Sequence, residues 1–446
     1  MVEINLTSCP VFREGLKQLN TTLGFYRPSF FKMQVNHTDD LTDLNALSDI
    51  VSAIYLHEYI HFLQDITTSN GFANISSVVD YIKHVNETAI KGNSRTFTVP
   101  AIPGSSPTSS NLDLQKEYIG STNDVNTATI KSVSRETKKI AQQNLGVVKI
   151  NYLDSNQNQC THYFGSHCIT ESMAYLVENS IYPNVIPNTY DFPYKAAVKV
   201  IEHEYPSFLH NPLNALALCD ASLGVFNPAE FFFTMLTKMK NDSYLPATPE
   251  KVYRYCASNI SFNFNGATNL NQLLLLTSAI ASNQLCDYFT TNVFGDNKIW
   301  INYTIATAVD IRLSNPFFIL EIARGGKIQT NIPFATVFNK VGTPMISNLN
   351  DEGTFFSPLQ YKSYNIRPEY LWAINQIYKI YIKPLINNSK KCELKSWCQK
   401  SCHNQNIADY TDTNCHNSSW LRVQNQQSCP FAVIWKTWGL ENEIPI

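Results

Sequence analysis

Residues 50–66 read IVSAIYLHEYIHFLQDI, a run in which apolar side chains recur at the spacing of an α-helix. Thr38-Asp39-Asp40 lies upstream and offers N-cap side chains, while Asn70-Gly71 follows the run and is typical of a helix end. We therefore predict one long helix over 41–68. In this predicted helix the apolar spacing starts at its first residue, with Leu41, Leu44, Leu47, Val51 and Ile54.

The order His57-Glu58-Tyr59-Ile60-His61 lies inside this predicted helix. A separation of four residues puts His57 and His61 on one face, one turn apart, where both imidazoles can reach one metal ion. Zinc accepts neutral imidazole nitrogens and tolerates three protein ligands with a water in the fourth position. Glu58 neighbours the first ligand, so its carboxylate can act as general base on that water without binding the metal. A helix that carries two histidines and binds no metal is the alternative.

Gln64 and Asp65 follow His61 by three and four residues, on nearly the same face of the predicted helix. Either side chain could hydrogen-bond a ligand imidazole and fix its tautomer. Asp65 could also be a metal ligand. A solvated helix end is the simpler interpretation for both residues.

A third metal ligand is expected downstream, and Glu171 is the best candidate. It stands in Ile169-Thr170-Glu171-Ser172-Met173-Ala174-Tyr175, at the start of a helix predicted over 169–179. Glu178 lies two turns further on a similar face and could be the ligand, a hydrogen-bond partner of one, or simply a surface charge. Asp65 and His167 are the remaining candidates.

Together the two segments resemble the zincin metallopeptidases of the gluzincin type. In that group the His-Glu-x-x-His helix packs against a second helix that supplies a glutamate, commonly followed three positions later by a small residue, here Ala174. The resemblance covers these two helices and implies that His57, His61 and Glu171 bind Zn²⁺. It also implies that Glu58 is the catalytic base. The implied fold is α+β and predominantly helical, with a zincin-like core that contains a small sheet or hairpin.

A hydrogen-bond donor opposite the base would stabilise the oxyanion that forms during hydrolysis. The candidates are Tyr163, Tyr175, His203 and His210. We favour His203 for this catalytic role, because the polar segment around it follows the second helix closely. The strand pair expected within 147–164 could supply the sheet edge on which an extended peptide lies.

The rest of the chain indicates three regions: a zincin-like catalytic region over 1–240, a helical region over 241–385 and a cysteine-rich module over 386–446. Prolines, serines and threonines make 93–127 an expected loop insertion, either a lid or a solvated loop. The other expected elements are strands at 30–35, 147–153 and 160–164, and helices at 75–90, 128–143, 194–204, 212–223, 228–239, 270–289 and 368–382.

Five cysteines and two histidines crowd into the C-terminal module: Cys392, Cys398, Cys402, Cys415, Cys429, His403 and His416. Four thiolates would suit a structural zinc, but the spacings are irregular and no Cys-x-x-Cys pair occurs among them. A structural metal, an iron–sulfur cluster, and free thiols or disulfides are therefore all open, and we favour thiols or disulfides.

Composition narrows the expected partners. The chain has 446 residues, of which 44% are hydrophobic and 16% charged, and its formal net charge is −2. No strong basic field is present to bind nucleic acid or an anionic membrane. The N-terminus has no basic segment followed by an apolar one, and the apolar stretches are shorter than the roughly 20 residues that span a bilayer. We expect a soluble, cytoplasmic protein that binds a protein or peptide substrate, with a regulatory protein partner left open.

The favoured function is that of a zinc-dependent hydrolase, an intracellular metallopeptidase that cleaves peptide bonds with a water activated by Glu58. Two further functions stay open. One is that of a non-catalytic binding or structural protein on the same scaffold. The second is metal-dependent hydrolysis of a non-peptide amide or ester, because an activated water attacks other acyl centres as well.

Overall fold

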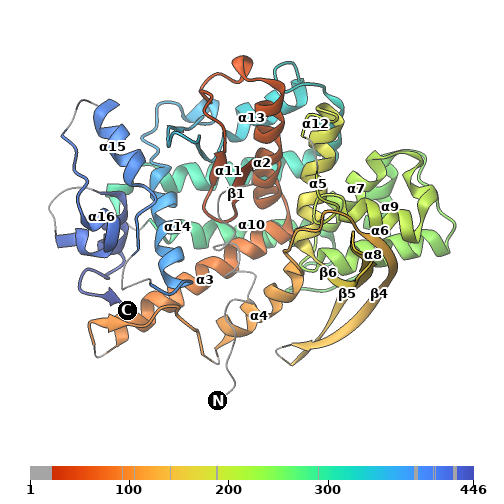
Figure 1. Ribbon diagram of the computed structural model, residues 1–446, viewed down its shortest axis with the longest axis horizontal. Helices are drawn as coiled ribbons and strands as arrows, with labels where there is room; N and C mark the ends of the chain where they lie inside the picture. The colour runs from red at the N-terminus through yellow and green to blue at the C-terminus, as the bar shows by residue number, and fades with distance from the viewer. Residues whose placement is uncertain are drawn as a thin grey trace.

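Helix α2 (Asp49–Thr67) carries the predicted motif and lies at the centre of the computed structural model (Figure 1). Ser48 caps its first turn, since its hydroxyl accepts a hydrogen bond from the Val51 N–H at 3.4 Å. Nearly every residue from Val51 onward is buried, because other elements cover the helix on all sides. The helix begins later than the predicted residue 41, and a 3₁₀ turn at Leu44–Ala46 occupies part of the difference.

The structure describes residues 23–446 except 93, 105, 141, 187–188, 290, 386–389, 405, 407 and 425–428. Within this part the fold is α+β with helices predominant, as predicted. No helix in it is long and apolar enough to cross a membrane. Its middle part contains α6 (Ala196–Glu204), α7 (Leu213–Ser222), α8 (Pro228–Asn241), α9 (Pro249–Ser258), α10 (Leu270–Cys286), α11 (Asn297–Ser314), α12 (Phe318–Arg324) and α13 (Ile332–Val341).

Helix α3 (Ser69–Lys91) starts directly after α2. Thr68 separates the two helices with an extended backbone, and its hydroxyl caps α3 by accepting the Gly71 N–H at 3.0 Å. The prediction that Asn70-Gly71 ends a helix is therefore wrong, because both residues lie in the first turn of α3. A Cβ on Gly71 would lie 2.4 Å from the Asp65 carbonyl oxygen, so glycine is needed where α3 turns back on the end of α2.

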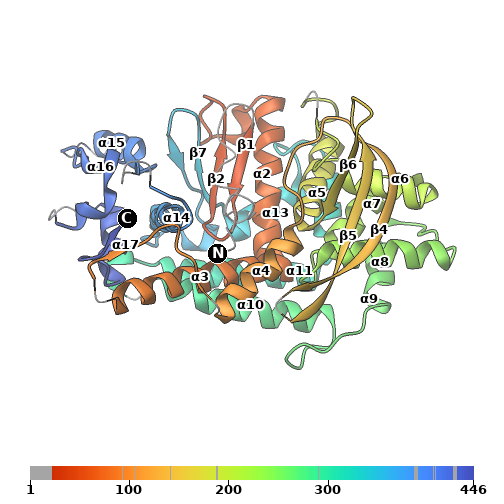
Figure 2. The same cartoon turned by 60° about the horizontal axis from the view of Figure 1, so that its bottom comes forward.

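The sheet beside α2 has the strand order β1-β2-β7-β8, formed by β1 (Gly24–Arg27), β2 (Lys32–Val35), β7 (Met345–Ser347) and β8 (Gly353–Thr354). Strand β2 pairs antiparallel with β1 and parallel with β7. In Figure 2 these strands stand between α2 and α14 (Glu369–Tyr381). Because β7 and β8 come from beyond residue 240, the sheet joins both sides of the predicted boundary there.

A second sheet consists of β4 (Thr129–Ile140), β5 (Gln143–Leu153) and β6 (Gln159–Phe164). The helix predicted over 128–143 is therefore wrong, whereas the two strands predicted within 147–164 are present. Lysine, arginine and glutamate in β4 favour a helix locally. However, β4 pairs with β5 along its whole length and alternates in exposure, so strand pairing outweighs local propensity.

Helix α5 (Ser166–Ile181) follows β6 directly and packs against α2, α7 and α12. The segment 93–127 is not the expected loop, because it contains α4 (Pro107–Ile119), which packs against α3 and α5. Ser106 caps α4 by accepting the Ser109 N–H at 3.2 Å, and Pro107 occupies the first turn. The segment therefore forms part of the wall around the motif helix.

The C-terminal module contains α15 (Lys395–Asn404), α16 (Asn414–Asn417) and α17 (Pro430–Thr437), and α17 packs against α14. Its last strand, β9 (Ile444–Pro445), pairs in parallel with β3 (Thr96–Phe97). The ten cysteines within the described ranges are all free thiols. Disulfides are therefore not observed in the part of this module that the structure describes.

Candidate metal centre

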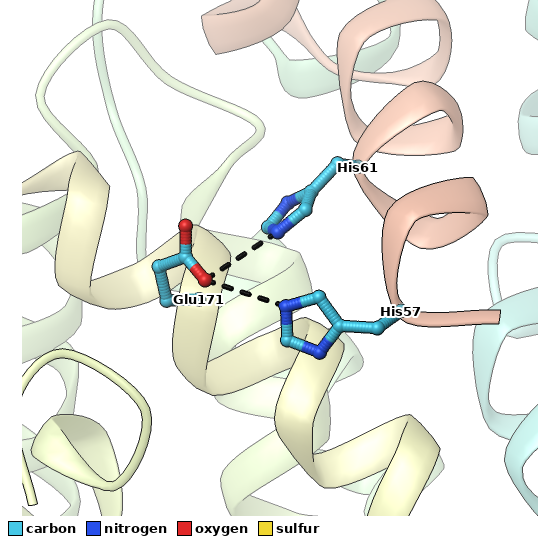
Figure 3. A group of neighbouring side chains, drawn as sticks. All are labelled: His57, His61 and Glu171. Carbon is cyan, nitrogen blue, oxygen red and sulfur yellow. Dashed lines mark hydrogen bonds and ion pairs between the residues drawn. The ribbon is translucent and has the colours of Figure 1, made fainter. Parts of the chain in front are cut away.

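Helices α2 and α5 bring His57, His61 and Glu171 together, with the two imidazoles pointing toward the carboxylate (Figure 3). Glu171 Oε2 lies 3.3 Å from His57 Nε2 and 3.5 Å from His61 Nε2. One donor atom from each residue lies within 4.8 Å of the others, close enough for one ion to bind all three. Among the residues described, no other set of three His, Cys, Asp or Glu side chains meets this condition.

Glu178 fixes the orientation of His57. Its Oε2 lies 2.9 Å from His57 Nδ1, two helical turns beyond Glu171 on α5. A carboxylate can only accept here, so Nδ1 carries a proton and Nε2 is the nitrogen that could bind a metal beside Glu171. Glu178 is thus the hydrogen-bond partner of a candidate ligand, one of the three roles that the sequence left open for it.

Gln64 fixes the orientation of His61 in the same way. Its Oε1 lies 2.8 Å from His61 Nδ1, while its Nε2 donates to the Thr170 carbonyl at 2.9 Å. The second bond determines which end of the amide faces His61, so the imidazole donates from Nδ1 and leaves Nε2 free to bind a metal. Gln64 therefore ties the first motif helix to the second through the residue before Glu171.

This donor set fits zinc. Two neutral imidazole nitrogens and one carboxylate leave a fourth tetrahedral position, as in catalytic zinc sites. Without a metal, burial opposes protonation of His57, but hydrogen bonds with Glu171 and Glu178 outweigh it and raise the pKa of His57 well above its ordinary value. Burial is likewise outweighed at Glu171, where His61 and His57 hold the carboxyl pKa well below its usual range. The carboxylates therefore favour positive charge between the two helices.

Glu58 lies buried next to the three residues, under strand β1. A Cβ on Gly24 would lie 2.9 Å from Glu58 Oε1 and 2.9 Å from Ile54 Cγ2, so glycine lets the strand approach the carboxylate. Burial raises the pKa of Glu58 to about 7, although His57 and His61 act in the opposite direction. A carboxyl group with such a pKa can accept and release a proton near neutral pH.

Asp65 and His167, which the sequence also allowed as the third ligand, have different roles. Asp65 Oδ2 accepts hydrogen bonds from the Tyr26 hydroxyl at 2.9 Å and the Ser29 N–H at 2.7 Å. It therefore ties the turn between β1 and β2 to the motif helix, rather than forming a solvated helix end. His167 lies one turn before Glu171, with its Nδ1 3.8 Å from Glu171 Oε1, outside the three-residue group.

A cavity of about 260 Å³ opens over this group. Strand β1, helices α2, α4 and α5, and residues 193–194 form its walls. Both polar and apolar side chains line it. Beyond the residues above, they include Phe25, Arg27, Gln115, Ile119, Asp124, Thr170 and Tyr194.

His203, which the sequence favoured for a catalytic role, does not line this cavity, so the structure does not bring it to His57, His61 and Glu171. It lies on α6, where its Nδ1 is 3.0 Å from Glu204 Oε1. Tyr163, Tyr175 and His210 are also not among the described residues that line the cavity. His203 and His210 follow residue 194, the last residue before α6 that lines the cavity, so closeness to α5 in sequence did not bring these two side chains to the candidate site.

Tyr194 is a candidate donor in the cavity that the sequence did not single out. It lines the cavity, and its ring centroid lies 5.8 Å from that of His57. Burial, together with Glu171 and Glu58, raises its pKa well above the ordinary value, so the phenol stays protonated and can donate. No motif marks this residue among the 23 tyrosines of the chain.

The five cysteines of the C-terminal module form no second centre among the described residues. All five are buried, but no three of their thiols, alone or with a histidine or carboxylate, meet the 4.8 Å condition. Burial and nearby thiols raise the pKa of Cys398 to about 12. Among the described residues the thiols therefore lie as separate protonated groups, and no three of them are close enough for one ion to bind.

Comparison of the chain with known protein families, with curated proteins and with solved structures found no match. The geometry of α2, α5 and β1 around the three converging side chains is therefore the feature that points to a function.

Proposed function

We propose that this protein is a zinc-dependent hydrolase, and more narrowly a metallopeptidase with a zincin-like core. The observation that carries the proposal is the convergence of His57, His61 and Glu171 within 4.8 Å. A His-Glu-x-x-His helix packed against a second helix that supplies a glutamate is also the arrangement expected of gluzincin-type peptidases. The hydrogen bonds that His57 and His61 donate to Glu178 and Gln64 also support the proposal. They select the imidazole tautomers that a metal requires.

Zinc, when bound, supplies a Lewis acid that makes water more acidic and polarises a substrate carbonyl. Glu58 accepts a proton from the attacking water and delivers it to the leaving nitrogen. Tyr194 donates a hydrogen bond to the oxygen on which negative charge develops. These assignments use side chains that all line one cavity.

A peptide is the substrate class that suits the strand beside this group. Strand β1 is outermost in its sheet within the described part of the chain, and each residue from Gly24 to Arg27 lines the cavity. An extended peptide adds to such a strand through backbone hydrogen bonds. The edge expected within 147–164 belongs instead to the other sheet, which does not border the cavity. We therefore propose β1 as the strand that aligns the substrate.

Glu58→Gln tests the proposal, because the amide cannot accept a proton while the zinc ligands stay intact. We expect stoichiometric zinc in the variant and a loss of about 10²–10⁴-fold in hydrolysis of a peptide library. Glu202→Gln, at an exposed position on α6, is the matched control and should retain full activity.

Two results would overturn the proposal. If Glu58→Gln hydrolysed peptides as fast as the wild type, Glu58 would not be the general base. Zinc-loaded wild type that hydrolyses neither peptides nor a parallel panel of amides and esters would favour a non-catalytic protein. If the wild type hydrolysed only amides and esters of that panel, the proposed metal-activated water would stand, and the substrate would be a non-peptide acyl compound.

A further inference from the structure

A second cavity, of about 270 Å³, lies on the other side of the junction between α2 and α3, and Thr68 lines both cavities. Its walls come from this junction and from α7, α9, α10 and α11 with the turn that follows it. Most of the lining is apolar, including Ala221, Leu274 and Phe317. A largely apolar cavity with a few placed polar groups is typical of sites for small molecules.

One wall of this cavity is held by a buried ion pair. Arg312 donates to Asp220 through both terminal nitrogens, at 2.7 and 2.8 Å, and the Asp220 side chain is fully buried. The Tyr253 hydroxyl also donates to Asp220 at 2.7 Å, and Arg312 reaches Thr67 Oγ1 at 3.2 Å. These bonds occupy the Asp220 carboxylate and make the wall rigid, so this acidic group is already neutralised.

A cation without an ion-pair partner also lines this cavity. Arg254 is exposed on α9 and has no ion pair with a described carboxylate. The charged residues that line the cavity are therefore two arginines against one aspartate. Because Asp220 is already paired with Arg312, a bound anion would supply the partner that Arg254 lacks.

From this arrangement we propose that the second cavity binds a small carboxylic acid with an apolar body. The apolar part lies against Leu274 and Phe317, and the carboxylate faces Arg254. The excess of one positive charge in the lining matches a monoanion. This site is separate from the proposed zinc chemistry, because none of the three metal-binding residues lines it.

Calorimetric titration of the full chain with hexanoate and with 3-phenylpropionate tests the proposal, each beside its uncharged alcohol. We expect the acids to bind and the alcohols to bind at least about tenfold more weakly. Arg254→Gln should weaken the acids by about 10- to 100-fold, and Leu274→Trp should abolish binding by filling the cavity. His61→Ala, in which we expect almost no zinc, should bind the acids like the wild type, which separates binding in this cavity from binding of a carboxylate to the proposed zinc.

The matched controls lie on the same two helices. Leu275→Trp changes the neighbouring leucine of α10, which is half exposed and outside the cavity, and Lys251→Gln removes an exposed charge of α9. Both should bind the acids like the wild type. Failure of both acids to bind at millimolar concentration would overturn the proposal. Equal binding of acids and alcohols, or acid binding unchanged in Arg254→Gln and Leu274→Trp, would overturn it as well.

Discussion

The two clusters of metal-ligating residue types in this chain differ in sequence spacing and in outcome. His57 and Glu171 are 114 residues apart, yet α2 and α5 bring their donor atoms to 3.3 Å. The five cysteines at the C-terminus are close in sequence and buried, yet among the described residues no three of their sulfur atoms lie within 4.8 Å of one another. Proximity in sequence therefore says little about a metal site, whereas helical spacing and the packing of two helices say much.

The difference has a physical cause. Each histidine of the first cluster has its Nδ1 bonded to a fixed acceptor, so the ligand atoms are oriented before a metal arrives. In the second cluster, burial raises the pKa of Cys392 well above its ordinary value, and neighbouring thiols act in the same direction. Such thiols pack as small apolar side chains rather than as ligands.

The largest effect expected among these variants concerns the cluster of His57, His61 and Glu171. Tyr194→Phe removes the proposed donor but keeps the ring that packs on His57, so kcat for peptide hydrolysis should fall about 10²–10³-fold. Zinc content should not change. Tyr175→Phe is the control, because Tyr175 lies on α5 outside the cavity lining. Equal kcat values for the two variants would contradict the role of Tyr194.

A smaller effect concerns the orientation of the ligands. Glu178→Gln replaces the obligate acceptor at His57 Nδ1 by an amide, so zinc affinity should fall about 10–100-fold in competition with a chelator. Gln64→Ala should weaken zinc similarly through His61. Glu202→Gln, on α6, should bind zinc like the wild type. Unchanged affinity in both ligand-orienting variants would show that the site is not held in place by these bonds.

The smallest effect lies in the C-terminal module. Glu393 accepts hydrogen bonds from Lys379 Nζ at 2.6 and 2.7 Å. Burial opposes ionisation of Glu393, but Lys379 and Lys32 outweigh it and lower its pKa from 4.5 to about 2. Because this folded-state pKa is depressed, the stabilisation is complete above about pH 4.5 and is lost as pH falls toward 2.

Glu393→Gln should therefore lower the free energy of unfolding in urea by about 1–3 kcal/mol at pH 7 and by much less near pH 2, without changing zinc content. Glu441→Gln, exposed near the C-terminus, is the control and should unfold like the wild type. Loss of zinc from Glu393→Gln would contradict the contrast between the two clusters, because it would show that the C-terminal module takes part in metal binding.

Local patterns predicted much of the metal centre but less of what surrounds it. The apolar spacing around His57 and His61 predicted the motif helix. Glu171, at the start of the helix predicted over 169–179, lies beside the two histidines in the structure. Tyr194 could not be found, since its position depends on how the chain passes over α2 after α5. The strand β4 was missed because its pairing with β5, rather than its own residues, determines its structure.

The partners of β1 and β2 were also beyond local patterns. Strand β7 reaches β2 from more than 300 residues away in sequence, and only three residues pair. A strand that short has no reliable signature of its own. Hence the sheet that carries the proposed substrate strand follows from tertiary packing, while the helix that carries the motif follows from its own sequence.

Metal content tests the central claim most directly. We would measure zinc by elemental analysis in the purified wild type, in His61→Ala and in Cys398→Ser. The account predicts about one zinc per chain in the wild type and in Cys398→Ser, and almost none in His61→Ala. Zinc retained by His61→Ala and lost from Cys398→Ser, or no zinc in the wild type after supplementation, would contradict it.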